Sequence, residues 1–293
     1  MVNDLEAKAA AGHPLTHDEA ERVLACPDLV SVGVLGELAR RAHHGSTVTY
    51  GQVLVVDTDA VPGDLGGARE IRITTRPASI EAACAQVRAV AAVAGSVPVT
   101  GFSAADLLAL AGGDHLVLAD MAARLRDAGL SGVAFLPVDV CADAAELVRA
   151  LNHGGLQVLR ATVDHAATVA ARLMCIERVA ALQAETSALR AFAPLPRFDE
   201  AGAPSTGYDD VRTIAVARLV CAAVPAIQVD WGMYGPKLAQ VAIAYGADDI
   251  DNVPAIDTLG LGHRRSPAED IARQITAAYA TPVARNGRFE RAS

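Results

Sequence analysis

Val229-Asp230-Trp231-Gly232-Met233-Tyr234-Gly235-Pro236-Lys237, continued through an apolar helix to Gly246-Ala247-Asp248-Asp249-Ile250-Asp251-Asn252, is the stretch that decides the fold. Apolar and polar residues alternate over Ala226–Trp231, which predicts a strand with one buried face. Pro236 suits a first helical turn, apolar residues then repeat at helical spacing, and Gly246 ends the helix. Asp249 and Asp251 lie on one side of a second short strand. In a barrel of such units, carboxylates at strand ends mark the usual place of the chemistry.

The same alternation of strand and helix runs through most of the chain. The other predicted strands are Thr47–Asp57, Glu70–Thr75, Val97–Phe102, Gly132–Asp139, Gln157–Asp164 and Ala188–Leu195. Eight strands that alternate with helices over about 250 residues are typical of an α/β fold, the (β/α)8 TIM-type barrel. A doubly wound sheet is the alternative, but no G-x-G-x-x-G motif follows any of these strands.

Two segments flank the predicted barrel. Thr16-His17-Asp18-Glu19 is a capping box that opens one helix, and a second helix follows at Leu29–Ala42. We therefore expect residues 1–45 to form a helical segment that packs on the barrel. The barrel itself would occupy residues 46–280, which leaves residues 281–293 as a C-terminal tail.

Composition limits the classes of protein that the chain can belong to. Its 293 residues are 52% hydrophobic and 4% aromatic, which suffices for one large domain with a core of Ala, Val and Leu. The net charge of −9 argues against binding to nucleic acid or to an anionic membrane. No apolar run approaches the ~20 residues of a membrane span. Met1–Ala11 lacks the apolar core of a secretory signal, so we expect a cytoplasmic protein.

The five cysteines are dispersed, and no two of them form a C-x-x-C pair. Such a set predicts buried apolar thiols rather than metal ligands. They are Cys26, Cys84, Cys141, Cys175 and Cys221.

Polar residues occupy strand positions that are expected to face the barrel lumen. A purely structural barrel would have Val, Ile and Leu there. The polar residues are Arg72, Thr74, Arg160, Thr162, Asp164, Arg190, Gln228, Asp230, Asp249 and Asp251. Because unpaired buried charges are costly, these side chains must pair with one another or with a ligand, and both alternatives remain open. The three arginines favour an anionic ligand, since the guanidinium fork matches a carboxylate.

Four residues are candidates for acid–base catalysis. Asp230, Asp249 and Asp251 are expected at the C-terminal mouth of the barrel, with Tyr234 as a further substrate-binding residue. His165 follows Asp164 just past a strand end, where a carboxylate would orient an imidazole. Alternatively, Asp164 only caps the next helix.

Two basic runs lie outside the predicted strands. His43-His44 ends a helix and is expected to be a solvated C-terminal cap. His263-Arg264-Arg265 precedes the last predicted helix, and it is either a solvated turn or a loop that grips an anion.

Several stretches resemble one group of enzymes over about three quarters of the chain. They are Leu5–Gly45, Pro194-Leu195, Asp209–Arg218, Trp231–Gln240, Tyr245–Asp251 and Val283-Ala284-Arg285. The resemblance is to the futalosine-pathway radical-SAM enzymes of menaquinone biosynthesis, aminofutalosine synthase and dehypoxanthine futalosine cyclase, and to the related deazaflavin synthase. The string Gly-Ala-Asp-Asp-hydrophobic-Asp is fairly specific to this group. The resemblance implies a radical-SAM type of barrel.

The chain departs from that family where the family performs its chemistry. The family carries C-x3-C-x2-C after its first strand, which holds a [4Fe–4S] cluster, whereas Thr47–Arg69 contains no cysteine. Thr74-Thr75-Arg76-Pro77 replaces the family's glycine-rich turn, and Pro254-Ala255-Ile256 replaces its paired glutamates. We therefore expect no iron–sulfur cluster, no bound metal and no radical chemistry.

Two functions of different classes fit these observations. The first is a cluster-less homologue that acts as an accessory or small-anion-binding or nucleoside-binding protein, with a cluster-bearing radical-SAM paralogue as a candidate partner. The second is an enzyme that uses lumenal Asp and Arg residues for non-radical chemistry on an aromatic carboxylate or nucleoside. The sequence leaves open residual S-adenosylmethionine binding and a homodimer.

Overall fold

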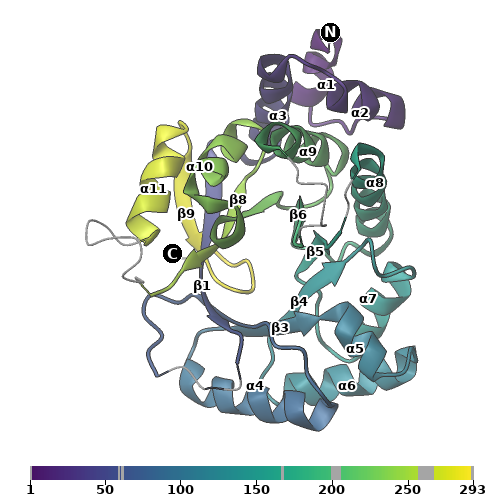
Figure 1. The fold of residues 1–293 in the computed structure, drawn as a ribbon, viewed down its shortest axis with the longest axis vertical. Coiled ribbons are helices and arrows are strands. Elements are labelled where there is room, and N and C mark those ends of the chain that lie inside the picture. The colour runs from purple at the N-terminus through teal and green to yellow at the C-terminus, as the bar shows by residue number, and fades with distance from the viewer. Residues whose placement is uncertain are drawn as a thin grey trace.

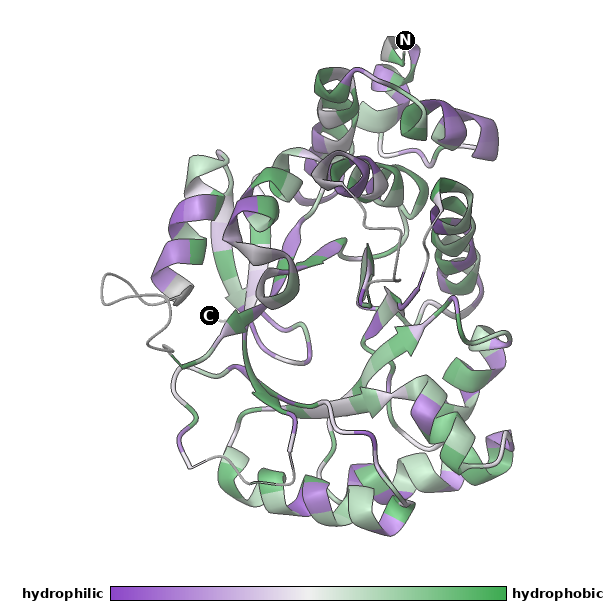
Figure 2. Ribbon diagram, viewed as in Figure 1, coloured by the Kyte–Doolittle hydropathy of each residue, from purple (hydrophilic) through white to green (hydrophobic). Residues whose placement is uncertain are grey.

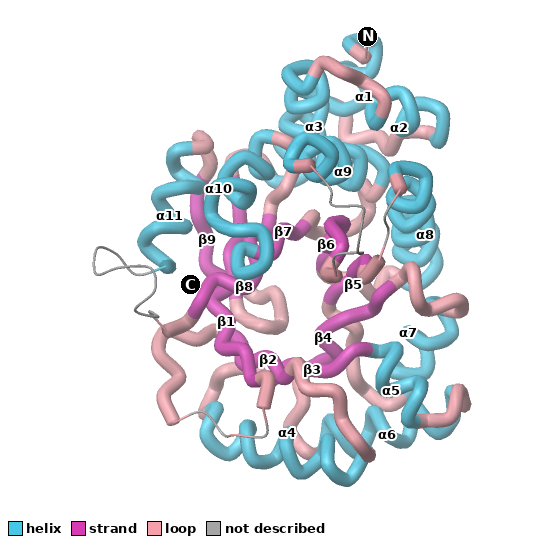
Figure 3. Tube along the Cα trace, viewed as in Figure 1, coloured by secondary structure: helices cyan, strands magenta, loops and turns pink. Residues whose placement is uncertain are grey.

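A ring of parallel strands, surrounded by helices, forms the centre of the molecule (Figures 1 and 3). The computed structural model describes residues 2–58, 60, 63–165, 168–198, 206–256 and 267–291. Its strands are β1 (Thr47–Val56), β2 (Glu70–Ile73), β3 (Val99–Ser103), β4 (Gly132–Pro137), β5 (Arg160–Val163), β6 (Ala191–Pro196), β7 (Gln228–Asp230), β8 (Asp249–Pro254) and β9 (Thr281–Arg285). A 3-10 turn (Asn3–Leu5) precedes the α-helices. These are α1 (Glu6–Ala10), α2 (His17–Leu24), α3 (Leu29–His44), α4 (Ile80–Ala94), α5 (Ala104–Leu110), α6 (His115–Asp127), α7 (Ala144–His153), α8 (Val169–Thr186), α9 (Gly207–Val220), α10 (Trp231–Ala244) and α11 (Pro267–Ala277).

The strand order shows that the sheet curls into a barrel. Neighbouring strands follow β6-β5-β4-β3-β2-β1-β8-β7 and pair in parallel. An isolated parallel bridge between Phe192 of β6 and Ile227, just before β7, joins the two ends of this order. The barrel is therefore nearly closed, and the predicted (β/α)8 TIM-type barrel is confirmed.

Helices cover the outside of the ring because parallel strands need long crossovers. All four residues of β2 are buried, as expected for a strand with the lumen on one face and helices on the other. Figure 2 shows strands that are apolar over much of their length and carry some polar segments, together with helices that have apolar and polar bands. Among the described helices, none combines the length and the apolar character that crossing a membrane requires.

Short polar side chains fix where several helices begin. The predicted capping box of α2 is present, since Thr16 Oγ accepts the N–H of Glu19 and Glu19 accepts the N–H of Thr16. Thr168 caps α8 by accepting the N–H of Ala171. The alternative role of Asp164 as the cap of this helix was therefore wrong.

The N-terminal helices pack as a group beside α9, at the top of Figure 1. Helix α3 buries Val32, Leu35 and Ala39. A side chain at Gly36 would come within 2.4 Å of the Tyr245 carbonyl oxygen, so glycine permits the close approach of α3 to the end of α10. The helical segment expected before the barrel is thus present and contacts its outer layer.

Helix α10 begins earlier than the sequence predicts. We expected the first turn at Pro236, but the helix begins at Trp231, where Asp230 caps it by accepting the N–H of Met233 at 2.9 Å. Gly235 has φ 77° and ψ 167°, so the helical path is broken there. The break places one short turn directly over the end of β7.

The predicted C-terminal tail contains a strand. Strand β9 pairs in parallel with the first half of β1, from Thr47↔Thr281 to Gly51↔Arg285. The segment after β9 then enters the ring of strands, where it is visible as a yellow loop in Figure 1 and a pink loop in Figure 3. Residues up to 291 therefore belong to the barrel, and the expectation of a tail was wrong.

The bridge between β6 and β7 depends on a large apolar side chain. Phe192 is fully buried, so Phe192→Ala should lower the free energy of unfolding by about 3–5 kcal/mol, because a cavity remains where the ring was. Urea denaturation measures this loss. Leu116→Ala is the control, since Leu116 is 82% exposed and should change stability by less than about 0.5 kcal/mol. Equal effects of the two substitutions would contradict the assigned packing.

Candidate functional site

Six buried charged side chains fill the lumen of the barrel. Three are carboxylates and three are guanidinium groups, and none is more than 2% exposed. They are Glu70, Arg72, Arg160, Asp249, Asp251 and Arg285. We call them the lumenal ion network. Equal numbers of each sign make the network formally neutral, which offsets the cost of removing so many charges from water.

Arg72 is fully engaged inside this network. Its Nη1 and Nη2 atoms donate to the two oxygens of Asp251 at 2.8 and 2.9 Å, and its Nε donates to Glu70 at 2.8 Å. The Thr100 hydroxyl adds a hydrogen bond to Glu70 at 2.6 Å. For Arg72 the structure supports pairing within the protein rather than with a ligand.

Arg285 completes the network from β9. It donates to both oxygens of Asp249, at 2.6 and 2.8 Å, and to Asp251 at 2.8 Å. The hydroxyl of Thr49 and the amide of Gln228 also donate to Asp249, at 2.6 and 2.7 Å. Gln228 therefore serves the network, and Arg285 is a lumenal residue that the sequence interpretation left in the tail.

The three aspartates expected at the mouth occupy different levels of the barrel. Asp249 is the first residue of β8 and is buried near its N-terminal end, and Asp251 lies one pleat further along. Asp230, the last residue of β7, is the register partner of Asp251, and both side chains line a pocket at the C-terminal mouth. The placement of Asp249 at the mouth was wrong, because the strand begins with this residue rather than ending near it.

The charges of the network shift one another's pKa values. Burial alone would raise the pKa of Glu70, but the Arg72 and Arg160 guanidinium groups outweigh burial and lower it to about 2. Burial also opposes ionisation of Asp251, whose pKa is nevertheless held well below its usual range by three arginines. Arg160 differs, since burial and the neighbouring Arg72 lower its pKa. Its closest carboxylate contact, to Glu70, is 3.4 Å long.

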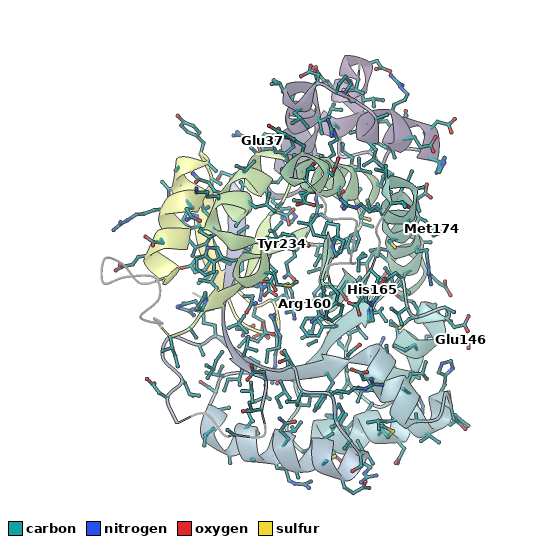
Figure 4. All side chains as sticks on the ribbon, in the orientation of Figure 1. Glu37, Glu146, Arg160, His165, Met174 and Tyr234 are labelled. Atoms are coloured by element: carbon teal, nitrogen blue, oxygen red, sulfur yellow. The ribbon has the colours of Figure 1, made fainter. Side chains whose placement is uncertain are left out.

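A small pocket of about 20 Å³ lies above the network at the C-terminal mouth. It is lined by Phe135, Arg160, Thr162, Ala193, Leu195, Arg197, Gln228, Val229, Asp230, Met233, Tyr234 and Asp251. Arg160 points into the ring of strands, as Figure 4 shows. Arg160 Nε and Thr162 Oγ are buried and have no hydrogen-bond partner among the described residues. Arg160 Nε lies 3.9 Å from Asp251, too far for a hydrogen bond. Because buried polar atoms are rarely left unpaired, these two atoms mark a place that suits a water molecule or a polar ligand atom.

Arg197 covers the pocket. Its guanidinium carbon lies 3.8 Å from the centre of the Phe135 ring, and its Nη1 lies 3.7 Å from Asp164. Burial lowers the pKa of Arg197, and Asp164 only partly compensates. The sequence interpretation missed this residue, which directly follows β6. Its position just past a strand end was the signal that could have found it.

Asp230 sits beside the pocket in an unusual backbone environment. The amide of Asn252 donates to its two carboxylate oxygens at 3.0 and 3.2 Å. Asn252 has φ 57°, and the register between β1 and β8 shifts at this point. Irregularities of this kind are frequent next to active sites. Burial, and then the charge of Asp251, raise the pKa of Asp230.

Tyr234 lies at the same mouth on the first part of α10. Its hydroxyl donates to the carbonyl oxygen of Pro196, so the side chain joins α10 to the end of β6. Figure 4 shows Tyr234 on the inner side of the helix layer. Tyr234, Asp230 and Thr162 line the same pocket at the mouth.

Three predicted site residues lie away from the pocket. Arg190 precedes β6 at the opposite end of the barrel, is exposed, and donates to Gln157 at 3.3 Å. Thr74 is exposed just past β2. His165 is also exposed, and its ring stacks on Phe198 at 5.4 Å. The lumenal placement of Arg190 and Thr74 was wrong, because their strands span fewer residues than predicted.

The proposed pair of Asp164 and His165 does not form within the described residues. Asp139, rather than Asp164, accepts the backbone N–H of His165, at 2.7 Å. Asp164 instead faces Arg197, and burial raises its pKa. Among the described residues, no carboxylate forms a hydrogen bond with the His165 ring, which contacts Phe198 instead.

The structure tests the prediction for only one of the two basic runs. His44 is not a simple solvated cap, since its Nε2 lies 3.3 Å from the buried Asp248. Residues His263-Arg264-Arg265 lie outside the described residues.

All five cysteines are buried, as the sequence predicts. Burial raises the pKa of Cys141 and Cys175 to about 11 and that of Cys221 to about 12. These thiols are therefore protonated near neutral pH. Within the described ranges, no group of three or more His, Cys, Asp or Glu side chains is arranged to hold a metal ion.

Comparisons with known proteins agree with the sequence resemblance. Aminodeoxyfutalosine synthase of Streptomyces coelicolor is 29% identical over 160 residues, which are 47% of this chain and 38% of that protein. The Thermus thermophilus enzyme of the same name is 32% identical over 141 residues, 43% of this chain and 37% of that protein. This chain resembles the futalosine-pathway enzymes. It spans less than half the length of these curated relatives, and no family model matches it.

A third relative and two solved structures widen the comparison. A 5-amino-6-(D-ribitylamino)uracil–L-tyrosine 4-hydroxyphenyl transferase of Methanosphaerula palustris is 28% identical over 173 residues, 56% of this chain and 45% of that protein. The structure of methylornithine synthase matches with a TM-score of 0.69 at 12% identity, over 95% of this chain and 97% of that one. The structure of a hydrogenase maturase of Carboxydothermus hydrogenoformans matches with a TM-score of 0.66 at 10% identity, over 96% of this chain and 79% of that one. These structural likenesses bear on the fold, and they agree with a barrel of the radical-SAM type.

Removal of Arg72 should destabilise the protein strongly. Arg72→Met removes the closest counter-charge of Glu70 and one of the two arginines that donate to Asp251, so we expect a loss of about 3–5 kcal/mol in the free energy of unfolding. Arg190→Met is the matched control and should cost less than about 0.5 kcal/mol, because Arg190 is exposed. Chemical denaturation at pH 7 measures both. A small loss for Arg72→Met would show that the network is not needed for stability.

Replacement of Asp230, unlike that of Arg72, should increase the free energy of unfolding. A carboxyl whose pKa is raised by folding loses stability as the pH rises through its unfolded and then its folded pKa. Asp230→Asn removes this penalty and keeps a good helix cap. We therefore expect the variant to be more stable than wild type at pH 7 and to converge with it at low pH. Unfolding curves between pH 3 and 7 test this, and a variant that is less stable at pH 7 would contradict the shift.

Proposed function

We propose that this protein is a cluster-less homologue of the futalosine-pathway enzymes that binds a small anionic or aromatic ligand at the C-terminal mouth of its barrel. The sequence likeness to two aminodeoxyfutalosine synthases supports the pathway assignment. In this proposal the protein acts in menaquinone or related biosynthesis as an accessory or ligand-binding protein, and a cluster-bearing paralogue is the partner that such a role implies.

Two unpaired buried polar atoms in the mouth pocket are the main support for the ligand-binding part of the proposal. Arg160 Nε and Thr162 Oγ line the mouth pocket, are buried, and lack a hydrogen-bond partner among the described residues. The other polar groups of the lumen are engaged in the ion network. A ligand with a carboxylate or a hydroxyl would supply the missing partners, since the Arg160 guanidinium donates hydrogen bonds and the Thr162 hydroxyl can donate or accept them.

Arg197 would bind the anionic group of such a ligand. At present its guanidinium rests on the Phe135 ring, with a long 3.7 Å contact to Asp164. The pocket beneath it, about 20 Å³, admits at most one water molecule. A ligand must therefore displace Arg197 outward, after which the fork can bind a carboxylate and the exposed Phe135 face can stack against an aromatic ring.

The available donor atoms do not fit a thiolate-held [4Fe–4S] cluster. The sequence between β1 and β2 contains no cysteine, and the five thiols present are buried and spread over separate elements. A cluster needs several thiolates that converge on it, whereas burial keeps three of these thiols protonated. We therefore assign no step to a cluster or to radical cleavage of S-adenosylmethionine.

Asp230 favours a second candidate function, that of a non-radical acid–base enzyme. It is buried beside the pocket, and its raised pKa lets it keep its proton to higher pH than an ordinary aspartate. A carboxyl of this kind can act as a general acid toward a ligand atom within hydrogen-bond reach. Asn252 would orient it through the hydrogen bonds to both oxygens.

Arg197→Met tests the ligand site. With 4-hydroxybenzoate and adenosine as probes, calorimetry should show binding to wild type that weakens by roughly 10- to 150-fold in the variant, since a charged hydrogen bond contributes about 1.5–3 kcal/mol. Arg149→Met is the control, because Arg149 pairs with Glu185 on the outer helices. If neither probe binds wild type, or if Arg197→Met binds as well, the mouth is not the site.

Iron analysis after anaerobic reconstitution with iron and sulfide tests the absence of a cluster. We expect a negligible iron content, because the loop after β1 has no thiolate ligands. About four irons per chain, the stoichiometry of a [4Fe–4S] cluster, together with cleavage of S-adenosylmethionine, would overturn the proposal.

A further inference from the structure

A second cavity lies at the opposite end of the barrel and is far larger than the mouth pocket. Its volume is about 570 Å³, and it opens between the N-terminal ends of the strands and the segment that follows β9. Barrel interiors are normally packed by side chains, so a space of this size at the base is unusual. We call it the basal cavity.

Three arginines line the basal cavity without an ion-pair partner in the described part of the chain. They are Arg190, Arg288 and Arg291. Arg190 donates to the amide oxygen of Gln157 at 3.3 Å, and Arg288 donates to the hydroxyl of Ser131 at 3.3 Å. Both partners are neutral, so neither guanidinium charge is compensated by the protein.

The two carboxylates in the cavity wall do not cancel these charges. Asp248 is already committed to Arg218, at 3.1 Å, and to His44, at 3.3 Å. Glu290 accepts from the neutral amide of Asn286 at 2.7 Å and has no cationic partner in the described ranges. Three uncompensated guanidinium groups against one carboxylate leave a surplus of two positive charges, in a chain whose net charge is −9.

The lumenal ion network separates this surplus from the mouth. Arg285 forms part of the cavity wall, but its charge is taken up by Asp249 and Asp251. Phe289 and Leu159 add apolar wall beside the arginines. The cavity thus offers a cationic rim of forked donors and an apolar floor, within the 300–1,000 Å³ that is usual for small-molecule sites.

We propose that the basal cavity binds a small molecule that carries a phosphate monoester, of about the size of a mononucleotide. A phosphate monoester is close to a dianion at neutral pH, which matches the surplus charge, and arginine forks bind its oxygens in pairs. The base or sugar would lie against Phe289 and Leu159. This site is separate from the mouth and does not depend on the function proposed above.

Titration with adenosine monophosphate, compared with adenosine, tests the proposal by calorimetry. The phosphorylated probe should bind the 293-residue chain with an affinity that falls as salt rises. The unphosphorylated probe should bind at least tenfold more weakly at this site. Arg190→Gln and Arg288→Gln should each weaken binding by roughly 10- to 150-fold, the loss of one charged hydrogen bond. Both side chains are exposed, so the variants should fold, which thermal unfolding verifies.

Two controls make the result specific. Arg88→Gln changes an exposed arginine on α4, outside the cavity, and should leave binding unchanged. Arg197→Met should also leave it unchanged, which distinguishes the basal cavity from the mouth. Adenosine monophosphate that binds the Arg197→Met variant, in which the mouth site is weakened, no better than adenosine does would overturn the proposal. Binding that survives both Arg190→Gln and Arg288→Gln would overturn it as well. Loss of binding in Arg197→Met alone would overturn it too, by placing the phosphate at the mouth.

Discussion

The pairing of three guanidinium groups with three carboxylates inside the barrel is the interaction on which the rest of the structure depends. It joins β2, β5, β8 and β9 through side chains that are almost completely removed from water. An apolar core would tolerate small shifts between strands, whereas a forked arginine contact holds its carboxylate at a fixed height. The network therefore sets the register of the barrel as well as filling it.

The same network divides the barrel into two unequal ends. Above it, Arg197 and Tyr234 close a pocket that holds at most one water molecule. Below it, the basal cavity is wide and carries uncompensated charge. Ligand chemistry in barrels is generally found at the C-terminal face, so the large space at the base is the unusual feature of this barrel.

The sequence was sufficient to predict the barrel and part of its interior. Arg72 and Thr162 were predicted to face the lumen because side chains alternate between the two faces of a strand. Glu70 lies two positions before Arg72 on the same face, but the sequence interpretation overlooked it. Arg190 was misplaced because the exact start of a strand depends on long-range pairing. Arg285 could not be placed, since five residues give too little pattern to reveal a strand that pairs with a partner more than 200 positions away.

Site chemistry was harder to predict than fold for a related reason. Whether a lumenal arginine serves a carboxylate of the protein or one of a ligand depends on which side chain stands opposite, and alternation does not contain that information. Arg72 has its partners within 3 Å, whereas Arg160, on a strand that is equally polar in sequence, does not. Only the assembled barrel separates these two cases.

The position of Arg285 along the chain has a consequence for synthesis. Five members of the ion network lie between residues 70 and 251, and the sixth comes from the last strand of the barrel. Until the ribosome releases that strand, the nascent lumen holds three carboxylates and two guanidinium groups. An excess negative charge opposes closure of the ring at this stage. The neutral network can therefore form only after β9 has been synthesised.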